Sequence, residues 1–413
     1  MTRPRVWSAQ DAEDWLLGLE QLGMRFGLHR MRRLTAALGD PQERFRAVHV
    51  VGTNGKSSTT RMTAAILARH GLRTGAYLSP HLVSFTERIL LGGADIGDDV
   101  FAEACARVKA QADALDDDAE ADDRVTQFEA LTAAAFLALA EEGVDVAVVE
   151  AGLGGRLDAT NVLTAEVVVL TNVALDHTRL LGSTVREIAG EKLAVVDAGA
   201  TLVVGSGLDP DAEALAHGTA ERLGATLVHA PADAGVPLLA QGAFQRRNFA
   251  TARAAAEALI GPLDETAVRE AAAATLVPGR FQVVAEHPTV LLDGAHNADG
   301  IAALAASLPE WLAGRRLVAV VSVLDDKDAA TMLASLLPLC DDVVVTSNAN
   351  PRAVPAEGLA SLAGRATHVE DDPGRAVALA KELAGEDGVV LATGSIYLIA
   401  DLLRPPGRRG ATF

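Results

Sequence analysis

The segment GTNGKSS, residues 52–58, is the stretch that decides how this chain folds. A short apolar run precedes it at residues 47–51, and a helical pattern follows it at residues 57–70. A strand, a glycine-rich loop and a lysine with hydroxyls at the start of a helix form a phosphate cradle, because backbone N–H groups and the lysine charge point into it. Lys56 supplies that charge. The segment therefore predicts a site for a nucleoside triphosphate, with a serine hydroxyl in reach of Mg²⁺.

The loop departs from the common P-loop, in which the first glycine lies five residues before the Gly-Lys pair. Val50 holds that position here, and Gly52 lies three residues before Gly55. A plain strand-to-helix turn is the alternative interpretation. The position of the loop between a strand and a helix favours phosphate binding.

Composition excludes several classes of protein. The 413 residues predict two or three domains, since single cores rarely exceed about 250–300 residues. A net charge of −19 argues against a nucleic-acid partner or an anionic membrane surface. Cys105 and Cys340 form neither a disulfide framework nor a zinc signature. Without a leader pattern or an apolar run of about 18 residues, we expect a cytoplasmic protein.

The predicted fold class is α/β, because apolar strands alternate with Ala- and Leu-rich helices, as in a parallel sheet covered on both faces. After a helical start, strands are predicted at 47–51, 144–149, 166–171 and 201–204, with helices at 126–142 and 185–196 among those between them. The later strands are predicted at 290–292, 317–323, 342–346 and 388–392, with helices at 302–312, 328–339, 356–364 and 373–383. The acidic run 113–123 is expected to be a solvated loop or a frayed helix end.

The best break between domains is Val-Pro-Gly at residues 277–279, since proline and glycine end the preceding helix. We therefore expect a P-loop-type, mostly parallel sheet domain over residues 1–279, followed by a smaller Rossmann-like α/β domain over residues 280–413.

Polar residues follow several of the predicted strands. Glu150 ends one strand, where a carboxylate lies at the ligand-binding edge of a parallel sheet and suits Mg²⁺; a capping or loop-bonding role is the alternative. The next segment, GLGGRLDATN at 152–161, lacks dinucleotide-fingerprint spacing, and a tight loop is its plain interpretation. His177 follows another strand, either as a structural residue or as a metal ligand. Ser79, in LSPHL, offers a hydroxyl at the same edge.

Other residues are also candidates for the site. Lys192 lies on an apolar helix, where it could extend to solvent, pair with Glu187 or Glu191, or act in catalysis. Asn248 could contact adenine or cap a helix. Arg280 lies at the break between domains, in reach of a phosphate. Asp293, His296 and Ser395 follow predicted strands in the second half of the chain. Asp293 and His296 are expected to be exposed.

Ten segments occur in a characteristic order: GTNGKSS, YLSPHLVSFTERI, TQFEA, EAGLGGRLDATNV, LDHTRLLGSTVREIAGEK, PGRF, LDGAHN, LDDKD, NPRA and TGSIYL. Together they resemble the bacterial dihydrofolate synthase/folylpolyglutamate synthase family of Mur-type, ATP-dependent amide ligases. The resemblance extends from about Arg25 to Leu398. SPHL together with GLGGRLDATN distinguishes this family from the cell-wall ligases.

The resemblance implies ATP and Mg²⁺ as cofactors, with L-glutamate and dihydropteroate or folate as substrates; we expect a monomer without nucleic-acid or membrane partners. It implies an acyl-phosphate intermediate and closure of the second domain, with residues 278–279 as a hinge. For ATP it implies Thr53, Asn54, Gly55, Lys56, Ser57, Ser58, Asn248, Arg280 and Asp293. For metal it implies Ser79, Glu150, His177 and Lys192, the last as a carbamate. The implied catalytic residues are Lys56, Lys192, His177, Arg280, Asp293 and His296, and those for substrate are Phe26, Gly27, His29, Thr126, Phe128 and Ser395.

Two departures from the family pattern stand out. Ser57 replaces the usual glycine after the loop lysine, which leaves open whether Ser57 or Ser58 meets Mg²⁺. Phe244 replaces the usual histidine of the adenine motif, although Gln245 and Asn248 remain. A cell-wall-type amino-acid ligase is one alternative. A P-loop nucleotide-binding regulator without ligase activity is another, and it predicts nucleotide binding without turnover.

Overall fold

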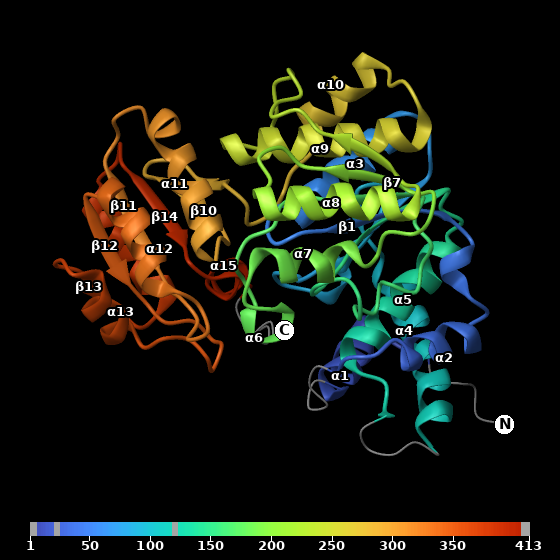
Figure 1. Ribbon diagram of the computed structural model, residues 1–413. Helices are drawn as coiled ribbons and strands as arrows, with labels where there is room; N and C mark the ends of the chain where they lie inside the picture. The colour runs from blue at the N-terminus through green and yellow to red at the C-terminus, as the bar shows by residue number, and fades with distance from the viewer. Residues whose placement is uncertain (1–5, 20–24, 118–122, 406–413) are drawn as a thin grey trace. The chain divides into compact units, whose positions relative to one another are not determined.

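The computed structural model describes residues 6–19, 25–117 and 123–405, and it divides into two compact units (Figure 1). The first comprises the described residues up to Pro237 together with Arg247–Ala273, and the second comprises Leu238–Arg246 and the described residues from Ala274 onward. The division therefore differs from a single break at residue 279. The early segment packs within the second unit, where the Ala243 amide donates to the Ser307 hydroxyl (3.0 Å) and the Phe244 ring contacts Phe281.

The first unit is built on an eight-stranded sheet in the order β4-β3-β2-β5-β1-β6-β7-β8. The six strands from β2 to β8 in that order are parallel to one another, whereas β3 is antiparallel to β2 and β4 is antiparallel to β3. The bounds are β1 (Arg46–Val51), β2 (Thr74–Tyr77), β3 (Ile89–Leu91), β4 (Ala94–Asp95), β5 (Val146–Glu150), β6 (Val167–Leu170), β7 (Thr201–Val204) and β8 (Thr226–His229).

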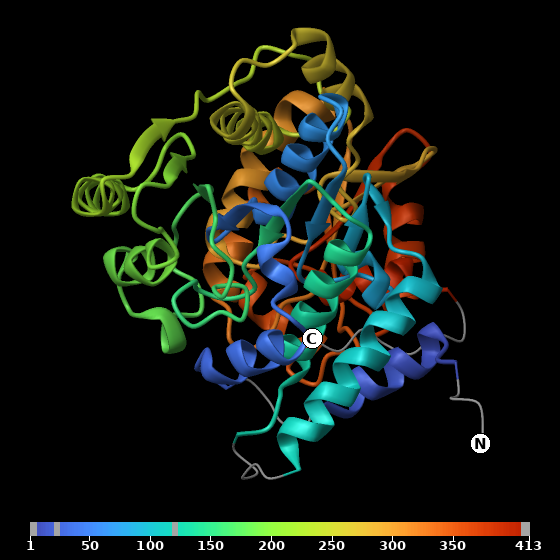
Figure 2. The same ribbon diagram turned by 90° about the vertical axis from the view of Figure 1, so that its right-hand side faces the viewer.

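Helices cover this sheet because its central strands are buried on both faces. Residues of α1, α4, α5, α7 and α8 share one hydrophobic core with one face of β1, β5, β6 and β7, and α3 packs against β1, β2 and β5 (Figure 2). The bounds are α1 (Ala9–Leu19), α2 (His29–Ala37), α3 (Lys56–Arg69), α4 (Asp98–Asp116), α5 (Gln127–Glu141), α6 (Thr178–Leu181), α7 (Val185–Leu193), α8 (Pro210–Leu223), α9 (Ala243–Ile260) and α10 (Glu265–Ala274), with the 3₁₀ turns η2 (Pro41–Glu43) and η3 (Phe85–Arg88).

The second unit is built on a six-stranded sheet in the order β13-β12-β11-β14-β10-β9, in which only β9 is antiparallel to its neighbour. Its strands are β9 (Gln282–Ala285), β10 (Thr289–Leu292), β11 (Leu317–Val321), β12 (Asp342–Val345), β13 (His368–Val369) and β14 (Val389–Thr393). Its helices are α11 (Ala298–Leu312), α12 (Ala329–Leu336), α13 (Ala356–Ala363), α14 (Pro373–Ala384) and α15 (Ile396–Leu403), with the 3₁₀ turn η5 (Leu337–Leu339).

The α/β fold class with mostly parallel sheets is confirmed, and the predicted strand at 201–204 has the observed bounds of β7. Several short strands were missed, among them β2, where the sequence indicated only an apolar turn. The acidic run begins as a helix end, since α4 continues to Asp116, and its residues 118–122 lie outside the described part. No helix in the described part of the chain is both long and apolar enough to cross a membrane.

Candidate active site

The predicted phosphate-binding loop, residues 52–55 and called the phosphate loop below, joins β1 to α3. It lies in the middle of the first sheet, where β5 and β6 flank β1 on its two sides. The chain passes from β1 to strands on one side of it and later to β6 on the other, and such a reversal is where open α/β sheets bind ligands. The loop after β6 braces the phosphate loop. Asn172 accepts from the Thr53 amide through its carbonyl (3.0 Å) and from the Asn54 amide through its side chain (2.7 Å).

Gly52 and Gly55 give this loop its shape. Gly52 has φ +154°, and a Cβ there would lie 1.9 Å from Oγ1 of Thr171. Gly55 has φ +82° directly before α3, and a Cβ there would lie 2.5 Å from Oδ1 of Asn248. Both positions need glycine because the backbone is left-handed and its neighbours are close. The turn therefore keeps its amides near the start of α3 without the first glycine of the common motif.

Lys56 and Ser57 open α3 and are half-buried, whereas Ser58 is buried. Nζ of Lys56 donates to the Thr53 carbonyl (3.2 Å), so the ammonium folds back over the loop. The Ser57 hydroxyl donates to Oε1 of Glu150 (2.9 Å). The Ser57 hydroxyl therefore lies beside the Glu150 carboxylate.

Glu150 ends β5 in register with Val50 of β1, and its side chain is buried. Its second oxygen, Oε2, accepts from the amide of Ser79 in the loop after β2 (3.1 Å). Three neighbouring strands thus bring a carboxylate and two serines together. Hard oxygen ligands of this kind fit Mg²⁺.

Lys192 comes from α7 and is only 3% exposed, with Nζ donating to the Gly52 carbonyl (2.8 Å). Burial first, and the nearby Lys56 charge second, lower the pKa of Lys192 to about 7. The two structural alternatives are therefore wrong: the amine does not extend to solvent, and its acidic neighbours are engaged elsewhere. Glu187 accepts from backbone amides at the start of α7, and Glu191 pairs with Arg156. A buried amine that is partly neutral near pH 7 is a nucleophile.

His177 lies farther along the loop that braces the phosphate loop, where Ala174 donates its amide to the Thr53 hydroxyl (3.1 Å). Its backbone has φ +49° and begins α6, and its amide donates to Oδ1 of Asp176 (2.9 Å). The imidazole is 40% exposed, with Nε2 lying 3.9 Å from Asp176. The left-handed backbone at His177 therefore turns the chain three residues after the contact between Ala174 and Thr53.

Asn248 lies inside α9 rather than at its start, so the helix-cap alternative is wrong. Its side chain lies against Gly55, the glycine that begins α3. Phe244, at the start of the same helix, packs its ring against Phe281 within the second unit. The amide of Asn248 therefore borders the phosphate loop, which favours the nucleotide interpretation.

The first turn of α5 reaches the same edge of the sheet. Thr126 caps this helix, and its hydroxyl accepts from the Glu129 amide. A Cβ on Gly152 would lie 2.5 Å from the Phe128 ring, and that ring lies 6.2 Å from the Tyr77 ring. Phe128 therefore stands beside the GLGGR loop, at the end of β5.

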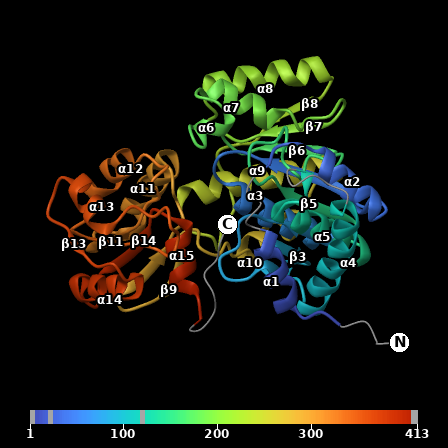
Figure 3. The same ribbon diagram turned by 90° about the horizontal axis from the view of Figure 1, so that it is seen from below.

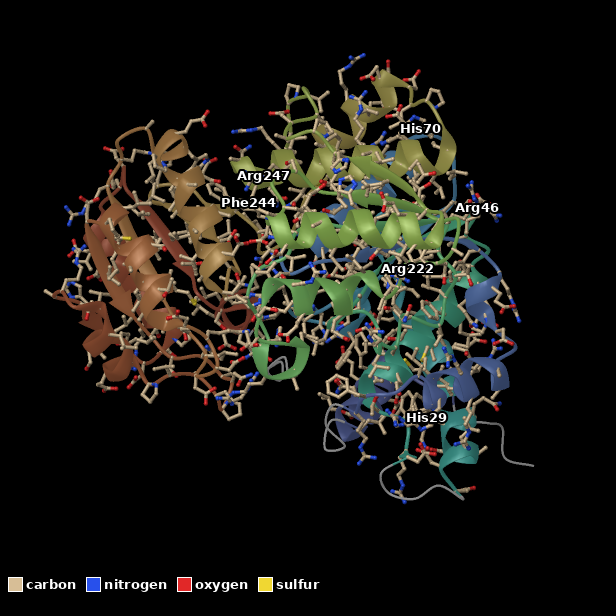
Figure 4. The ribbon with its side chains drawn as sticks, in the orientation of Figure 1. His29, Arg46, His70, Arg222, Phe244 and Arg247 are labelled. Carbon is tan, nitrogen blue, oxygen red and sulfur yellow. The ribbon has the colours of Figure 1, made fainter. Side chains whose placement is uncertain are left out.

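The segment 26–29 is tied to this helix by an ion pair that sequence reasoning missed. Nε of Arg30 donates to both oxygens of Glu129 (3.1 Å each), and both side chains are buried. Phe26 is exposed, and His29, labelled in Figure 4, pairs with Asp123. Glu129 forms a capping box with Thr126 at the start of α5, but nothing in the sequence indicated that it also pairs with an arginine 99 residues away.

The GLGGR loop is held by a second group of residues that sequence reasoning missed. Asp158 accepts from the amides of Leu153 (2.8 Å) and Thr160 (3.0 Å), and the Thr160 hydroxyl contacts Nε2 of His49 (2.8 Å). Burial raises the pKa of Asp158 and lowers that of His49 to about 4, so His49 is neutral. The tight-loop interpretation is therefore right.

In the second unit, Asp293 ends up buried, so the expected exposure of this residue is wrong. Its Oδ2 accepts from the Phe281 amide (2.9 Å) and its Oδ1 from the Ala295 amide (2.8 Å). Burial raises its pKa, against the opposing effect of Arg280. Nη1 of Arg280 is itself buried and has no hydrogen-bond partner among the described residues.

His296 and Ser395 are partly committed to the backbone of their own loops. Nδ1 of the half-buried His296 lies 2.9 Å from the Gly294 carbonyl, to which it donates, which leaves Nε2 as the other ring nitrogen. Ser395 is buried and caps α15, where its hydroxyl accepts from the Tyr397 amide (3.2 Å). The structure thus places Asp293, His296 and Ser395 after β10 and β14, at one edge of the second sheet.

Comparison with known proteins defines the class. Residues 50–204 match the Mur ligase middle domain, and residues 279–396 match the glutamate ligase domain of Mur ligases. The chain is therefore a Mur-type ligase, an enzyme that forms an amide bond at the expense of ATP. It belongs to the dihydrofolate synthase/folylpolyglutamate synthase family.

Three similarities cover nearly the whole chain. A dihydrofolate synthase/folylpolyglutamate synthase of Bacillus subtilis is 34% identical over 95% of this chain and 98% of its own. Folylpolyglutamate synthase of Mycobacterium tuberculosis complexed with ADP has a TM-score of 0.87 at 34% identity, covering 95% of this chain and 98% of that one. The bifunctional enzyme of Yersinia pestis, complexed with AMPPNP and a Mn ion, has a TM-score of 0.86 at 30% identity, covering 97% and 99%.

Proposed function

We propose that this ligase joins L-glutamate to dihydropteroate, and to reduced folates, through an acyl phosphate. The observation that carries the proposal is the meeting of the phosphate loop, Glu150 and Lys192 at one edge of the first sheet. Similarity over most of the chain to enzymes named dihydrofolate synthase/folylpolyglutamate synthase supports the substrate class. A carboxylate does not react with an amine at neutral pH, so ATP must first convert it to a species with a good leaving group.

The residues at this edge fit ATP and Mg²⁺. Residues 53–58 supply amides, a lysine and a hydroxyl for the phosphates. Ser79, Glu150 and His177 are the proposed metal ligands, and a carbamate on Lys192 would add a carboxylate for a second ion. When bound, Mg²⁺ supplies positive charge that offsets the charge developing on the transferred phosphoryl group.

The carbamate proposal rests on the state of the Lys192 amine. A pKa of about 7 leaves a substantial neutral fraction at physiological pH, and only the neutral amine attacks CO₂. The bond to the Gly52 carbonyl holds that nitrogen under the phosphate loop. A carbamate would place a negative charge near Lys56, and the opposite charge of that lysine would favour it.

The chain's own residues then hold the phosphates and exclude water from the intermediate. Lys56 and the loop amides hold the phosphates while the phosphoryl group passes to the substrate carboxylate. Asn248, beside Gly55, is proposed to contact the nucleotide. The glutamate amine attacks the acyl phosphate and expels phosphate. Water competes for this intermediate, so its exclusion is part of the mechanism.

Residues of the second unit are assigned to ATP and glutamate by the same proposal. Arg280 has a buried Nη1 that lacks a partner within the described chain, and a phosphate oxygen would satisfy it. Asp293 holds the backbone directly after that arginine, through the Phe281 amide, and also accepts from the Ala295 amide. His296 and Ser395 are proposed to act near the reacting groups.

For the pterin ring we propose a pocket formed by the start of α5 and the segment before α2. Phe128 offers an aromatic face beside Gly152, and Thr126 a hydroxyl at the helix start. Phe26, Gly27 and His29 complete the proposed pocket. The buried Arg30–Glu129 pair supports it, since this pair fixes one segment against the other.

A substrate panel tests the function. Purified enzyme with saturating Mg²⁺ and glutamate should release ADP with dihydropteroate, and a second arm with monoglutamyl tetrahydrofolate tests chain extension. Product mass should show one added glutamate per ADP. No release with any pteroate acceptor, or faster release with a muramyl-peptide acceptor, would contradict the proposal.

We further propose that the enzyme acts as a cytoplasmic monomer, where ATP is available. Light scattering on a sizing column at the assay concentration should give one chain per particle, and a dimer mass would overturn the oligomeric part.

A further inference from the structure

Three potential metal ligands converge far from the phosphate loop, at the β8 edge of the first sheet. Glu213 and His217 lie one turn apart on α8, and His229 ends β8. Helix α8 and strand β8 lie side by side (Figure 3). Oε1 of Glu213 lies 3.2 Å from Nε2 of His217 and 2.5 Å from Nε2 of His229. The three ligand atoms all lie within 4.8 Å of one another.

This geometry suits a tetrahedral ion. With metal–nitrogen and metal–oxygen distances of about 2.0–2.2 Å, two ligand atoms of a tetrahedral zinc site lie about 3.3 Å apart. The Glu213–His217 separation already has this value, and the two rings face each other with centroids 5.3 Å apart. Small side-chain rotations would separate the closer pair around an ion. The spacing of Glu213 and His217, four residues apart on a helix, places both on one face.

The donor set selects the kind of metal. Two imidazole nitrogens and one carboxylate are the ligands of zinc and similar transition metals, whereas Mg²⁺ takes oxygen and keeps its waters. The oxygen-rich group around Glu150 has the opposite character. Strands β6 and β7 separate β8 from the strand that carries the phosphate loop. The two sets of ligands therefore differ in both chemistry and place.

The location gives such an ion a structural effect. Strand β8 ends the sheet order, and its side chains are exposed or only half-buried. Hydrophobic burial therefore contributes little to holding β8, whose end carries His229. An ion shared by α8 and β8 would tie this strand to its helix, since binding to the folded state alone stabilises it.

We propose that Glu213, His217 and His229 form a binding site for one Zn²⁺ ion, with the fourth position taken by water. The site is separate from the Mg²⁺–ATP chemistry, and it fastens the edge strand β8 to α8. Ligase turnover with Mg²⁺ does not require it.

Metal titration of the untagged chain tests this proposal. Zn²⁺ is titrated by calorimetry, and Co²⁺ by visible absorption, in buffer with saturating Mg²⁺ and no nucleotide. We expect one bound ion per chain, an intense four-coordinate Co²⁺ spectrum and a higher Tm with Zn²⁺. His217→Ala and His229→Ala should each weaken binding by more than the roughly 10- to 100-fold that loss of an outer-shell partner costs.

His368→Ala is the matched control, because His368 is also a half-exposed histidine beside a carboxylate, Asp342. It should leave the affinity unchanged. Glu213→Gln should weaken Zn²⁺ binding while it keeps the shape of the side chain. Absence of a stoichiometric site, a six-coordinate Co²⁺ spectrum, or equal affinity in the His217→Ala/His229→Ala double variant would overturn the proposal.

Discussion

The carboxyl edges of the two parallel sheets are built with different chemistry. In the first unit, polar groups from separate strands meet one another, as Glu150 meets Ser57 and Lys192 meets Gly52. In the second unit, Asp293 accepts from the backbone amides of Phe281 and Ala295, and Ser395 accepts from that of Tyr397. The first edge therefore joins side chains from separate segments of the chain, whereas at the second edge side chains hold backbone amides. Substitutions at the first edge should change turnover, and substitutions at the second should also change stability.

The largest effect is expected from Lys192→Ala. Loss of the buried amine, and of the carbamate proposed on it, should reduce turnover by about 10³-fold, the scale of losing a preorganised electrostatic group. Nucleotide binding should change only a few-fold, as read by fluorescence titration. Lys109→Ala, at a surface ion pair on α4, is the control and should keep full activity. Retention of more than about a tenth of the turnover would show that the lysine is structural.

Glu150→Gln should reduce turnover by about 10²-fold and raise the Mg²⁺ concentration needed for half-maximal rate, since the amide keeps the shape but loses the charge. Glu166→Gln, which removes a surface ion pair with Arg46 near the start of β6, is the matched control. An unchanged Mg²⁺ requirement would remove Glu150 from the proposed metal ligands.

The two loop serines sharpen the comparison further. Ser57→Ala should raise the Mg²⁺ requirement by about tenfold, the scale of one lost hydrogen bond to a charged group. Ser58→Ala should change it less, because Ser58 is buried, whereas the Ser57 hydroxyl donates to Glu150. Steady-state rates at a series of Mg²⁺ concentrations compare the two. A larger effect at Ser58 would reverse their assignment.

Asp293→Asn tests the supporting role of the second edge. An amide can accept from only one of the two backbone N–H groups, and its own NH₂ would face the other. We expect a loss of about 1–3 kcal/mol in the free energy of unfolding, measured in urea. Asp299→Asn, in the first turn of α11, is the comparison and should cost well under 1 kcal/mol. Unchanged stability of Asp293→Asn would show that these two bonds do not hold the loop.

The last prediction is a pH dependence of stability at Lys192. Its pKa falls from an ordinary 10.5 to about 7 on folding, so between these values the unfolded chain binds a proton that the folded chain lacks. Stability should therefore rise with pH across this window, by up to about 1 kcal/mol per unit. Lys192→Met removes this contribution. In bicarbonate-free buffer, the stability of wild type relative to the variant should rise from pH 7 to pH 9, and a flat difference would contradict the lowered pKa.

Sequence patterns predicted those elements whose cause is local. The apolar run before GTNGKSS became β1, and the helix predicted at 126–142 is α5, which Thr126 caps. Strand β2 escaped prediction because its sequence, TGAY, has no apolar run like the LVV of the equally short β7, and it depends on its neighbours in the sheet. The position of Glu150 at a strand end was visible, since a carboxylate after an apolar run is itself a signal.

Contacts across long stretches of chain could not be predicted. The sequence left three interpretations of Lys192 open, because its partner is a carbonyl 140 residues earlier. Asp293 looked exposed because loops are usually solvated, but two backbone amides compensate for its burial. The His49–Thr160 contact joins residues 111 apart, and nothing in the GLGGRLDATN segment that contains Thr160 indicates His49 as a partner.

The Arg30–Glu129 pair limits how this chain can evolve. Losing either partner alone would leave an uncompensated charge in the interior, at a cost of about 3–5 kcal/mol, which is a large share of the stability of most domains. The two positions are therefore epistatic: a lineage can exchange them only together, or after other substitutions have raised stability. Homologues should show the pair either intact or jointly replaced by residues of similar volume, with few single replacements.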